Sequence, residues 1–211
     1  MPKYLGIGGP KTGSVSLNLA LNACGIDSTH CHLENVKAVD AIQQEDFDAA
    51  RQIWQPHDCW VDGPMYNCTP QQLIQAVDED TIFIHHTRDH DTAVTSAMIH
   101  VLDSRLTAKA RSKKNGWEDR WTSISTVKMY QIYRQADRVA EGLREKGRQV
   151  ITVNLCEEHN SWETFCPLFG FETPNEPFPM GNTGVARMER LLEHYRRYGS
   201  KPAPASDAGE S

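Results

Sequence analysis

The chain opens with a strand, a glycine-containing loop and a helix in immediate succession, and this unit constrains the fold more than any other feature. The stretch KYLGIG (residues 3–8) is short and apolar, and it leads into the loop GGPKTG. Between Ser14 and Gly25, apolar residues recur at helical spacing. A strand that feeds a helix through a short loop is the repeating unit of parallel sheets. The opening therefore predicts an α/β protein.

The rest of the chain repeats this alternation of strand-like and helical segments. Further strands are predicted at CWVDGP (59–64), TIFIHHT (81–87) and QVITVN (149–154). Helices are predicted over 34–54 as one or two segments, over TPQQLIQAV, after Arg88, over 118–146 and over 183–198. The helix in TPQQLIQAV has Thr69 as its N-cap and Pro70 as its first residue. We therefore expect a parallel sheet covered by helices.

The length of the chain limits it to one such sheet. With 211 residues, 39% of them hydrophobic, the chain can bury one substantial core. We expect a single domain over residues 1–198. The tail over 199–211 is small, polar and rich in proline and alanine, which predicts a flexible segment.

Charge and hydropathy argue against two classes of partner. The net charge of −6 argues against a broad surface for nucleic acid, so an anionic ligand has to be held locally. No apolar run approaches the roughly 20 residues that span a bilayer, and none near the start has the length of a signal peptide. We therefore expect a cytoplasmic protein with no membrane or nucleic-acid partner.

The cysteines and histidines give little support for a disulfide framework or a metal centre. Six cysteines occur without any C-x-x-C pair, which favours reduced thiols that pack as small hydrophobic groups. In THCH (29–32), His30 and His32 stand two residues apart, but no second ligand pair has a recognisable spacing. We expect no metal.

The loop GGPKTGS is suited to holding a phosphate group. Its glycines let the backbone approach a ligand closely, and a helix that begins at Ser14 presents unpaired amides and the positive end of its dipole. Lys11 adds a full charge, and Thr12, Ser14 and Ser16 add hydroxyl donors. In the Walker A loop the lysine follows the last glycine, whereas Lys11 precedes Gly13. This order argues against a nucleoside triphosphatase; a tight turn with a solvated lysine is the plainer alternative.

Three segments together resemble the sulfotransferase family. GGPKTGSVSLNLALNACGI resembles the P-K-[TS]-G-[TS]-[TS]-S/W loop that binds the donor 3′-phosphoadenosine 5′-phosphosulfate (PAPS). HTRDHDTAVTSAM looks like the family's 3′-phosphate element, with Arg88 at the end of a strand and Ser96 on the next helix. SWETFCPLFGFETPNEPFPMGN (161–182) is similar to a stretch near the C-terminus of small sulfotransferase-like proteins. The resemblance implies a P-loop-type, three-layer α/β/α fold around a central parallel sheet.

The resemblance also implies a reaction and its residues. A sulfuryl group would pass from PAPS to a hydroxyl or amine of a small-molecule acceptor, leaving 3′-phosphoadenosine 5′-phosphate (PAP) without help from a metal. The donor site would comprise Pro10, Lys11, Thr12, Gly13, Ser14, Val15, Ser16, Arg88 and Ser96. Lys11 would stabilise charge on the leaving phosphate. Asp62, two residues before Pro64, stands where cytosolic members have a base histidine before a proline.

The sequence leaves several assignments open. His30, His32 and His57 are rival bases, and Asp62 could instead cap a turn. His85 and His86 alternate along a strand, so one is expected to face the core and the other could face the cleft, with structural roles favoured.

The family pattern is incomplete in three places. Val15 replaces a hydroxyl donor of the common loop, and Ser16 stands where cytosolic members carry the aromatic residue that stacks on adenine. No R-K-G element is present, and the candidates to replace it are Arg187, Lys113 and Lys114. The basic loop over 109–120 could close over the donor or be a solvated connector. Four aromatic residues could line an acceptor pocket: Trp117, Trp121, Tyr130 and Tyr133. Packing in the core is the favoured role for them.

Two other functions compete with sulfuryl transfer. One is a nucleotide-dependent kinase on the same architecture, and the other is a sulfotransferase-like protein that binds nucleotide without turnover. The sequence leaves the acceptor undefined, and a homodimer is compatible with it.

Overall fold

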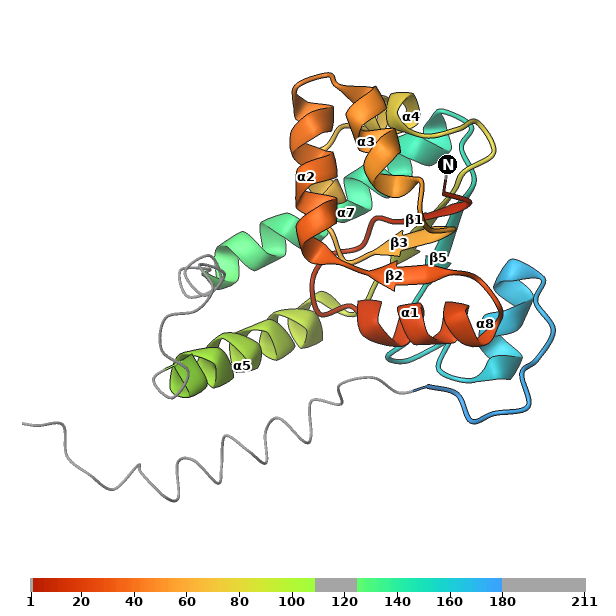
Figure 1. The fold of residues 1–211 in the computed structure, drawn as a ribbon. Coiled ribbons are helices and arrows are strands. Elements are labelled where there is room, and N and C mark those ends of the chain that lie inside the picture. Colours follow the sequence, from red (N-terminus) through yellow and green to blue (C-terminus); the bar gives the residue numbers. More distant parts are fainter. Residues whose placement is uncertain (1, 109–124, 180–211) are drawn as a thin grey trace, which may run out of the picture.

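The computed structural model describes residues 2–108 and 125–179, which form a parallel five-stranded sheet with helices on both faces (Figure 1). The strand order is β2-β3-β1-β4-β5, and every neighbouring pair is parallel. The strands are β1 (Tyr4–Gly6), β2 (Ser28–His30), β3 (Cys59–Val61), β4 (Ile82–His86) and β5 (Val150–Val153). The predicted α/β class and parallel sheet are thus confirmed.

The helices form two layers, one against each face of the sheet. They are α1 (Ser14–Ala23), α2 (His32–Gln43), α3 (Phe47–Trp54), α4 (Pro70–Ala76), α5 (His90–Ala108), α7 (Thr126–Glu145) and α8 (Trp162–Phe169), with a 3₁₀ turn η1 at Met65–Asn67. One buried cluster joins the sheet to α2, α3, α4 and α7, and a second joins it to α1 and α8. The expected three-layer arrangement is therefore present.

The inner strands β1, β3 and β4 have mostly apolar sequences because both faces of the sheet are covered there. Leu5, Trp60 and Phe83 pack toward α2, α3, α4 and α7. Their neighbours Val61 and Ile84 pack toward α1 and α8. Successive side chains of a strand point to opposite faces, so β1, β3 and β4 each supply both cores.

The direction in which strands are added to the sheet reverses next to β1. From β1 the chain passes through α1 to the outer strand β2 and returns to β3, and only later does it cross to β4 on the other side. Open parallel sheets bind ligands outside the carboxyl ends of the strands at such a reversal. The segments that follow β1, β3 and β4 all lie at this edge. They carry Lys11, Asp62 and Arg88, respectively.

Several elements differ from the predictions. The segment predicted as the second strand is the third, because β2 was missed: its sequence is only STH, and it forms the edge of the sheet. The range 34–54 contains two helices, and Asp46 separates them by capping α3, where its carboxylate accepts from the amide of Ala49 at 3.0 Å. Helix α8, within the segment 161–182, was not predicted.

Other predictions are met as far as the structure describes them. Thr69 caps α4 in a capping box with Gln72, and Pro70 is the first helical residue. The long helix of 118–146 is described from Thr126 onward as α7. The predicted helix over 183–198 and the tail lie outside the described residues.

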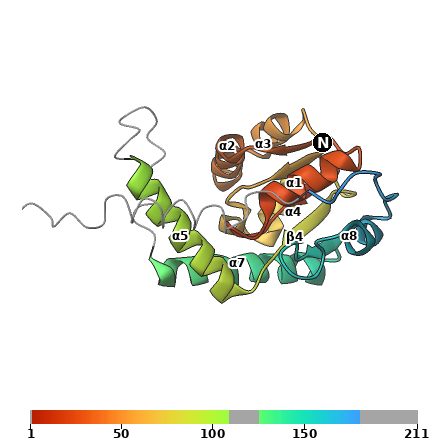
Figure 2. The same ribbon diagram turned by 90° about the horizontal axis from the view of Figure 1, so that it is seen from below.

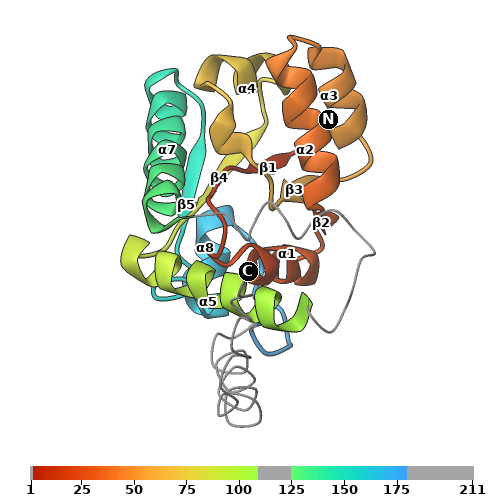
Figure 3. The same ribbon diagram turned by 90° about the vertical axis from the view of Figure 1, so that its left-hand side faces the viewer.

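Helix α5 leaves the sheet and crosses α7 (Figures 2 and 3). Ala93 and Ala97 of α5 are buried with Met129 and Tyr133 of α7 in a small cluster apart from the two main ones. This contact brings the beginning of α5, just after Arg88, against the same helix that packs on the sheet. Across the described ranges, no helix is both long enough and apolar enough to cross a membrane. All six cysteines are free.

Candidate functional site

The loop between β1 and α1 presents the beginning of a helix without a side-chain cap. Gly13 is the N-cap residue of α1, with φ 94°, and it has no side chain with which to accept from the helix amides. Uncapped amides and the positive end of the helix dipole favour an anion at this point. Lys11 adopts φ 64°, a left-handed conformation that is uncommon for residues other than glycine. The loop therefore has the form expected of an anion site, with a cation at its bend.

The hydroxyl of Thr12 is used inside the loop. It donates to the carbonyl oxygen of Gly9 at 2.6 Å and lies 2.7 Å from Nδ1 of His86, and the residue is only 2% exposed. A hydroxyl has one proton, so if Gly9 accepts it, Nδ1 of His86 must be the donor to Thr12. Thr12 can therefore offer a ligand its backbone amide, but not the side-chain donor that was expected from the sequence.

His86 is the buried support beneath this loop. A Cβ added at Gly8 would lie 2.0 Å from the carbonyl oxygen of His86 and 2.3 Å from its Nδ1, so only glycine fits above it. Burial, with smaller contributions from His85 and His30, lowers the pKa of His86 to about 3. Its Nε2 has no hydrogen-bond partner within the part of the chain that the structure describes. His86 is therefore neutral.

Asp62 lies close to two of the three histidines that were considered as alternative bases. Its Oδ2 lies 3.4 Å from Nε2 of His30 and 4.0 Å from Nδ1 of His32. Nε2 of His30 also lies 3.0 Å from Oγ of Ser14, the first residue of α1. The side chains of Asp62, His30 and His32 are 25%, 29% and 24% exposed, so all three are accessible from solvent. The ends of β2 and β3 and the beginnings of α1 and α2 thus bring four polar side chains together.

A buried network holds Asp62 in place. Asp62 has φ 67°, again left-handed. The residue before it, Val61, accepts a hydrogen bond through its carbonyl from the fully buried amide of Asn35 at 3.0 Å. The indole of Trp54 in turn donates to Asn35 Oδ1 at 3.0 Å. Burial, together with the nearby charge of Asp62, raises the pKa of Tyr66 to about 12, so this neighbouring phenol keeps its proton.

Arg88 lies beside the loop because β4, which it follows, pairs with β1 in parallel. Its guanidinium lowers the pKa of Tyr133 and of Cys156, acting against the larger effect of burial. A Cβ added at Gly13 would lie 3.9 Å from Sγ of Cys156, which places this thiol at the start of α1. Nε of Arg88 is buried and has no hydrogen-bond partner among the described residues. An anion would satisfy this donor. Ser96 lies further along on α5 and is half-buried.

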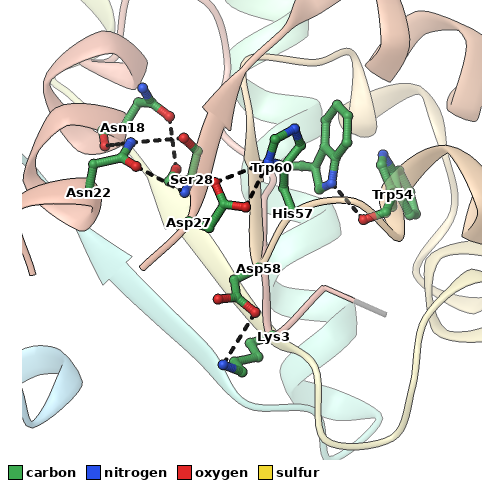
Figure 4. Close-up of polar contacts among 9 residues, drawn as sticks. All are labelled: Lys3, Asn18, Asn22, Asp27, Ser28, Trp54, His57, Asp58 and Trp60. Carbon is green, nitrogen blue, oxygen red and sulfur yellow. Dashed lines mark hydrogen bonds and ion pairs between the residues drawn. The ribbon is translucent and has the colours of Figure 1, made fainter. Parts of the chain in front are cut away.

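The third rival base, His57, lies at the amino ends of the strands, opposite the loop that carries Lys11. His57 precedes β3, and its Nδ1 lies 3.0 Å from Oδ2 of Asp27, which precedes β2 (Figure 4). The same figure shows the ion pair between Lys3 and Asp58, whose Nζ and Oδ1 are 3.2 Å apart, where β1 and β3 begin. His57 therefore cannot act with Lys11, which lies at the carboxyl ends of the strands.

Some of the remaining candidates lie among the described residues, and others lie outside them. His85 faces α7, where its Nε2 lies 3.2 Å from Oδ1 of Asp137, so it has a structural contact. Several candidates lie outside the described residues: the loop 109–120 with Lys113, Lys114 and Trp117, and also Trp121 and Arg187. In the residues that are described, no group of three or more histidine, cysteine or acidic side chains could hold a metal ion.

Two residues shape this edge in ways that were not predicted: Asn35 was not singled out from the sequence, and Tyr133 was considered only as an acceptor-pocket or core residue. Asn35 supports the strand end before Asp62, and Tyr133 donates to the carbonyl of Pro10 in the loop at 2.8 Å. Neither lies near its partner in sequence, and a buried asparagine or tyrosine in a helix shows no motif.

Comparison with known proteins agrees with this geometry. A family model described as a sulfotransferase domain matches residues 3–187, a range that contains the loop, Asp62 and Arg88. No curated protein matches the chain. Because the family match covers most of the sequence and its fold agrees with the observed α/β/α layers, the chain belongs to the sulfotransferase-domain family.

Proposed function

We propose that the protein transfers a sulfuryl group from PAPS to a hydroxyl or amine of a small-molecule acceptor. The observation that carries this proposal is the position of two cationic segments at one edge of the sheet. Lys11 follows β1 and Arg88 follows β4, and these two strands are paired neighbours. A nucleotide with a phosphate at its 5′ end and another on its ribose needs two such points of charge.

The donor-binding residues fit an anionic nucleotide. The uncapped start of α1 and the backbone of the loop over Pro10–Ser16 suit the 5′-phosphosulfate. The buried Nε of Arg88, which has no partner in the described part of the chain, suits the 3′-phosphate, with Ser96 as a second contact. PAPS supplies the sulfuryl group and PAP is the product.

Lys11 and Asp62 divide the chemistry between them. The acceptor oxygen or nitrogen forms the new bond to sulfur, and the bond from sulfur to the phosphate oxygen breaks with its electron pair on that oxygen. Lys11 places a positive charge where this negative charge develops, which lowers the energy of the transition state more than that of the ground state.

Asp62 is the proposed recipient of the acceptor's proton. His30 lies within 3.4 Å of the same carboxylate and is the alternative base. Ser14 connects His30 to the loop, so the base and the donor site share one contact chain. The chemistry assigned to these residues uses no metal.

Calorimetry and a transfer assay test the proposal. We expect PAP to bind tightly without magnesium, and ATP to bind weakly. A preference for ATP with magnesium would instead favour a kinase. Labelled sulfate should then pass from PAPS to at least one member of a panel of phenols, alcohols, sugars and amines. If PAP binds and no acceptor is ever sulfated, the protein is a nucleotide-binding member of the family without turnover.

We also propose the compartment and the partners of the protein. Six free cysteines suit a reducing compartment, and we place the protein in the cytoplasm with a small-molecule acceptor and no nucleic-acid or membrane partner. Whether it works as a homodimer is tested by light scattering at assay concentration.

A further inference from the structure

A tyrosine far away in the sequence holds the peptide that precedes Lys11. The hydroxyl of Tyr133, on α7, donates to the carbonyl oxygen of Pro10 at 2.8 Å. This carbonyl belongs to the peptide plane that joins Pro10 to Lys11, and the angle φ of Lys11 describes rotation about the next bond. Lys11 has φ 64°, which a residue with a side chain adopts only when its surroundings require it. The hydrogen bond from Tyr133 is one such requirement.

The ring of Tyr133 is itself fixed from two sides. On one side it lies against Gly9, where an added Cβ would be 2.6 Å from Cδ1 of the ring. On the other side it stacks on His90, with ring centroids 5.4 Å apart and an interplanar angle of 26°. Nε2 of His90 lies 3.2 Å from Oδ2 of Asp137, one turn further along α7. The ring therefore has little freedom, and its hydroxyl has a defined position.

Tyr133 remains a hydrogen-bond donor and lies between the two cationic segments. Burial raises the pKa of its phenol well above the usual range, so the hydroxyl keeps its proton at any working pH. Arg88 lowers the same pKa, as a nearby cation does. His90, on which the ring stacks, is two residues beyond Arg88. One side chain thus contacts the loop of Lys11 and the segment that follows Arg88.

We infer that Tyr133 is a positioning residue for sulfuryl transfer: through the carbonyl of Pro10 it holds the loop so that the ammonium of Lys11 meets the leaving phosphate. This inference rests on the proposed function. It assigns Tyr133 no contact with either substrate, so its effect on the rate has to pass through Lys11.

The test replaces only the hydroxyl. Tyr133→Phe keeps the ring against Gly9 and His90 but leaves the carbonyl of Pro10 without its donor, and kcat should fall about tenfold. The KM for PAPS should stay within about threefold, because the uncapped start of α1 and Arg88 remain. Tyr130→Phe is the matched control. Tyr130 lies one turn earlier on α7 and donates to Asp91 on α5, away from the loop. Its kcat should stay within about twofold of the wild type.

A double-mutant cycle with Lys11→Ala separates positioning from general loss of structure. If Tyr133 acts through Lys11, Tyr133→Phe should lower kcat in the wild-type background and not in the Lys11→Ala background. An equal loss in both backgrounds, or an unchanged kcat for Tyr133→Phe, overturns the inference. Single-turnover measurements with labelled PAPS give the slow rates that the cycle needs.

Failure of the proposed function would show in the wild-type protein, before any variant is made. In that case crystal structures of the wild type and of Tyr133→Phe decide the inference without a substrate. The positioning role is supported if Lys11 loses its left-handed conformation in Tyr133→Phe and keeps it in the wild type. An unchanged Lys11 backbone in both proteins overturns it.

Discussion

The stability of the protein should depend on pH through His86, and this dependence tests the account of the loop most directly. His86 is fully buried, shares a hydrogen bond with Thr12 and has a pKa lowered from 6.5 to about 3. In the unfolded chain the same imidazole takes up a proton near pH 6.5. Below that pH the unfolded state therefore binds more protons than the folded state, so the free energy of unfolding falls as the pH falls.

The size of the effect follows from the two pKa values. Above about pH 6.5, His86 is neutral in both the folded and the unfolded protein, so its titration takes nothing from the free energy of unfolding. Each pH unit below that value removes about 1.4 kcal/mol. Between pH 7 and pH 5 the loss is therefore about 2 kcal/mol, a large part of the roughly 5–15 kcal/mol that typically stabilises a folded protein. The carboxylates with lowered pKa values, Asp89, Asp137 and Glu163, lose their contributions at more acidic pH, because carboxylates titrate near pH 4.

Urea unfolding at pH 8, 7, 6 and 5 measures the dependence. His86→Asn is the informative variant, because the asparagine amide can donate to Thr12 from near the place of Nδ1 but does not titrate. The loss of stability from pH 7 to pH 5 should be about 2 kcal/mol smaller in the variant than in the wild type. Between pH 8 and pH 7 the two proteins should change in parallel, which is the internal control. Equal losses from pH 7 to pH 5 would show that His86 is not buried in its neutral form.

Four substitutions test the other parts of the site. Lys11→Ala should lower kcat about 10³-fold while calorimetry finds the affinity for PAP changed only a few-fold, because its charge is needed mainly in the transition state. Arg88→Ala should raise the KM for PAPS about 10- to 100-fold, and an unchanged KM would remove Arg88 from the donor site. Asp62→Asn should lower kcat at least about 10²-fold, and near-normal turnover would move the role of base to His30. Asn35→Ala leaves a buried indole N–H and a strand carbonyl unpaired, so urea unfolding should show a loss of about 2–4 kcal/mol; a loss below 1 kcal/mol would contradict the network.

Two of the three described non-glycine residues with positive φ connect these tests; the third, Glu45, follows α2. Lys11 and Asp62 both have positive φ values, 64° and 67°, and both are the residues proposed for the chemistry. Such conformations cost free energy and persist only where the surroundings determine them. Tyr133 supports the first through Pro10, and Asn35 supports the second through Val61. The same physical device, a buried donor on the preceding carbonyl, holds each of them.

Elements with local signals could be predicted without any coordinates. The apolar runs of β1, β3, β4 and β5, the helix after the glycine loop, and the Thr69 cap all follow from spacing and residue type over a few positions. The loop pattern around Lys11 and Gly13, and the placement of Arg88 at a strand end with Ser96 on the next helix, are likewise local, and they carried the resemblance to the family. The resemblance to sulfotransferases needed no coordinates, and the family match over 3–187 confirms it.

The contacts between these segments could not be predicted in the same way, because they depend on how the whole chain folds. The three-residue strand β2 exists because β3 offers it an edge, and it carries His30 to Asp62 while His57 is left at the opposite edge. The hydroxyl of Thr12 turns inward because His86 arrives beneath the loop, and Tyr133 reaches Pro10 across 123 residues. Periodicity in a sequence specifies which face of an element is buried, but not which element buries it. Contacts between distant segments depend on the order of strands and the packing of helices, and these are properties of the whole fold.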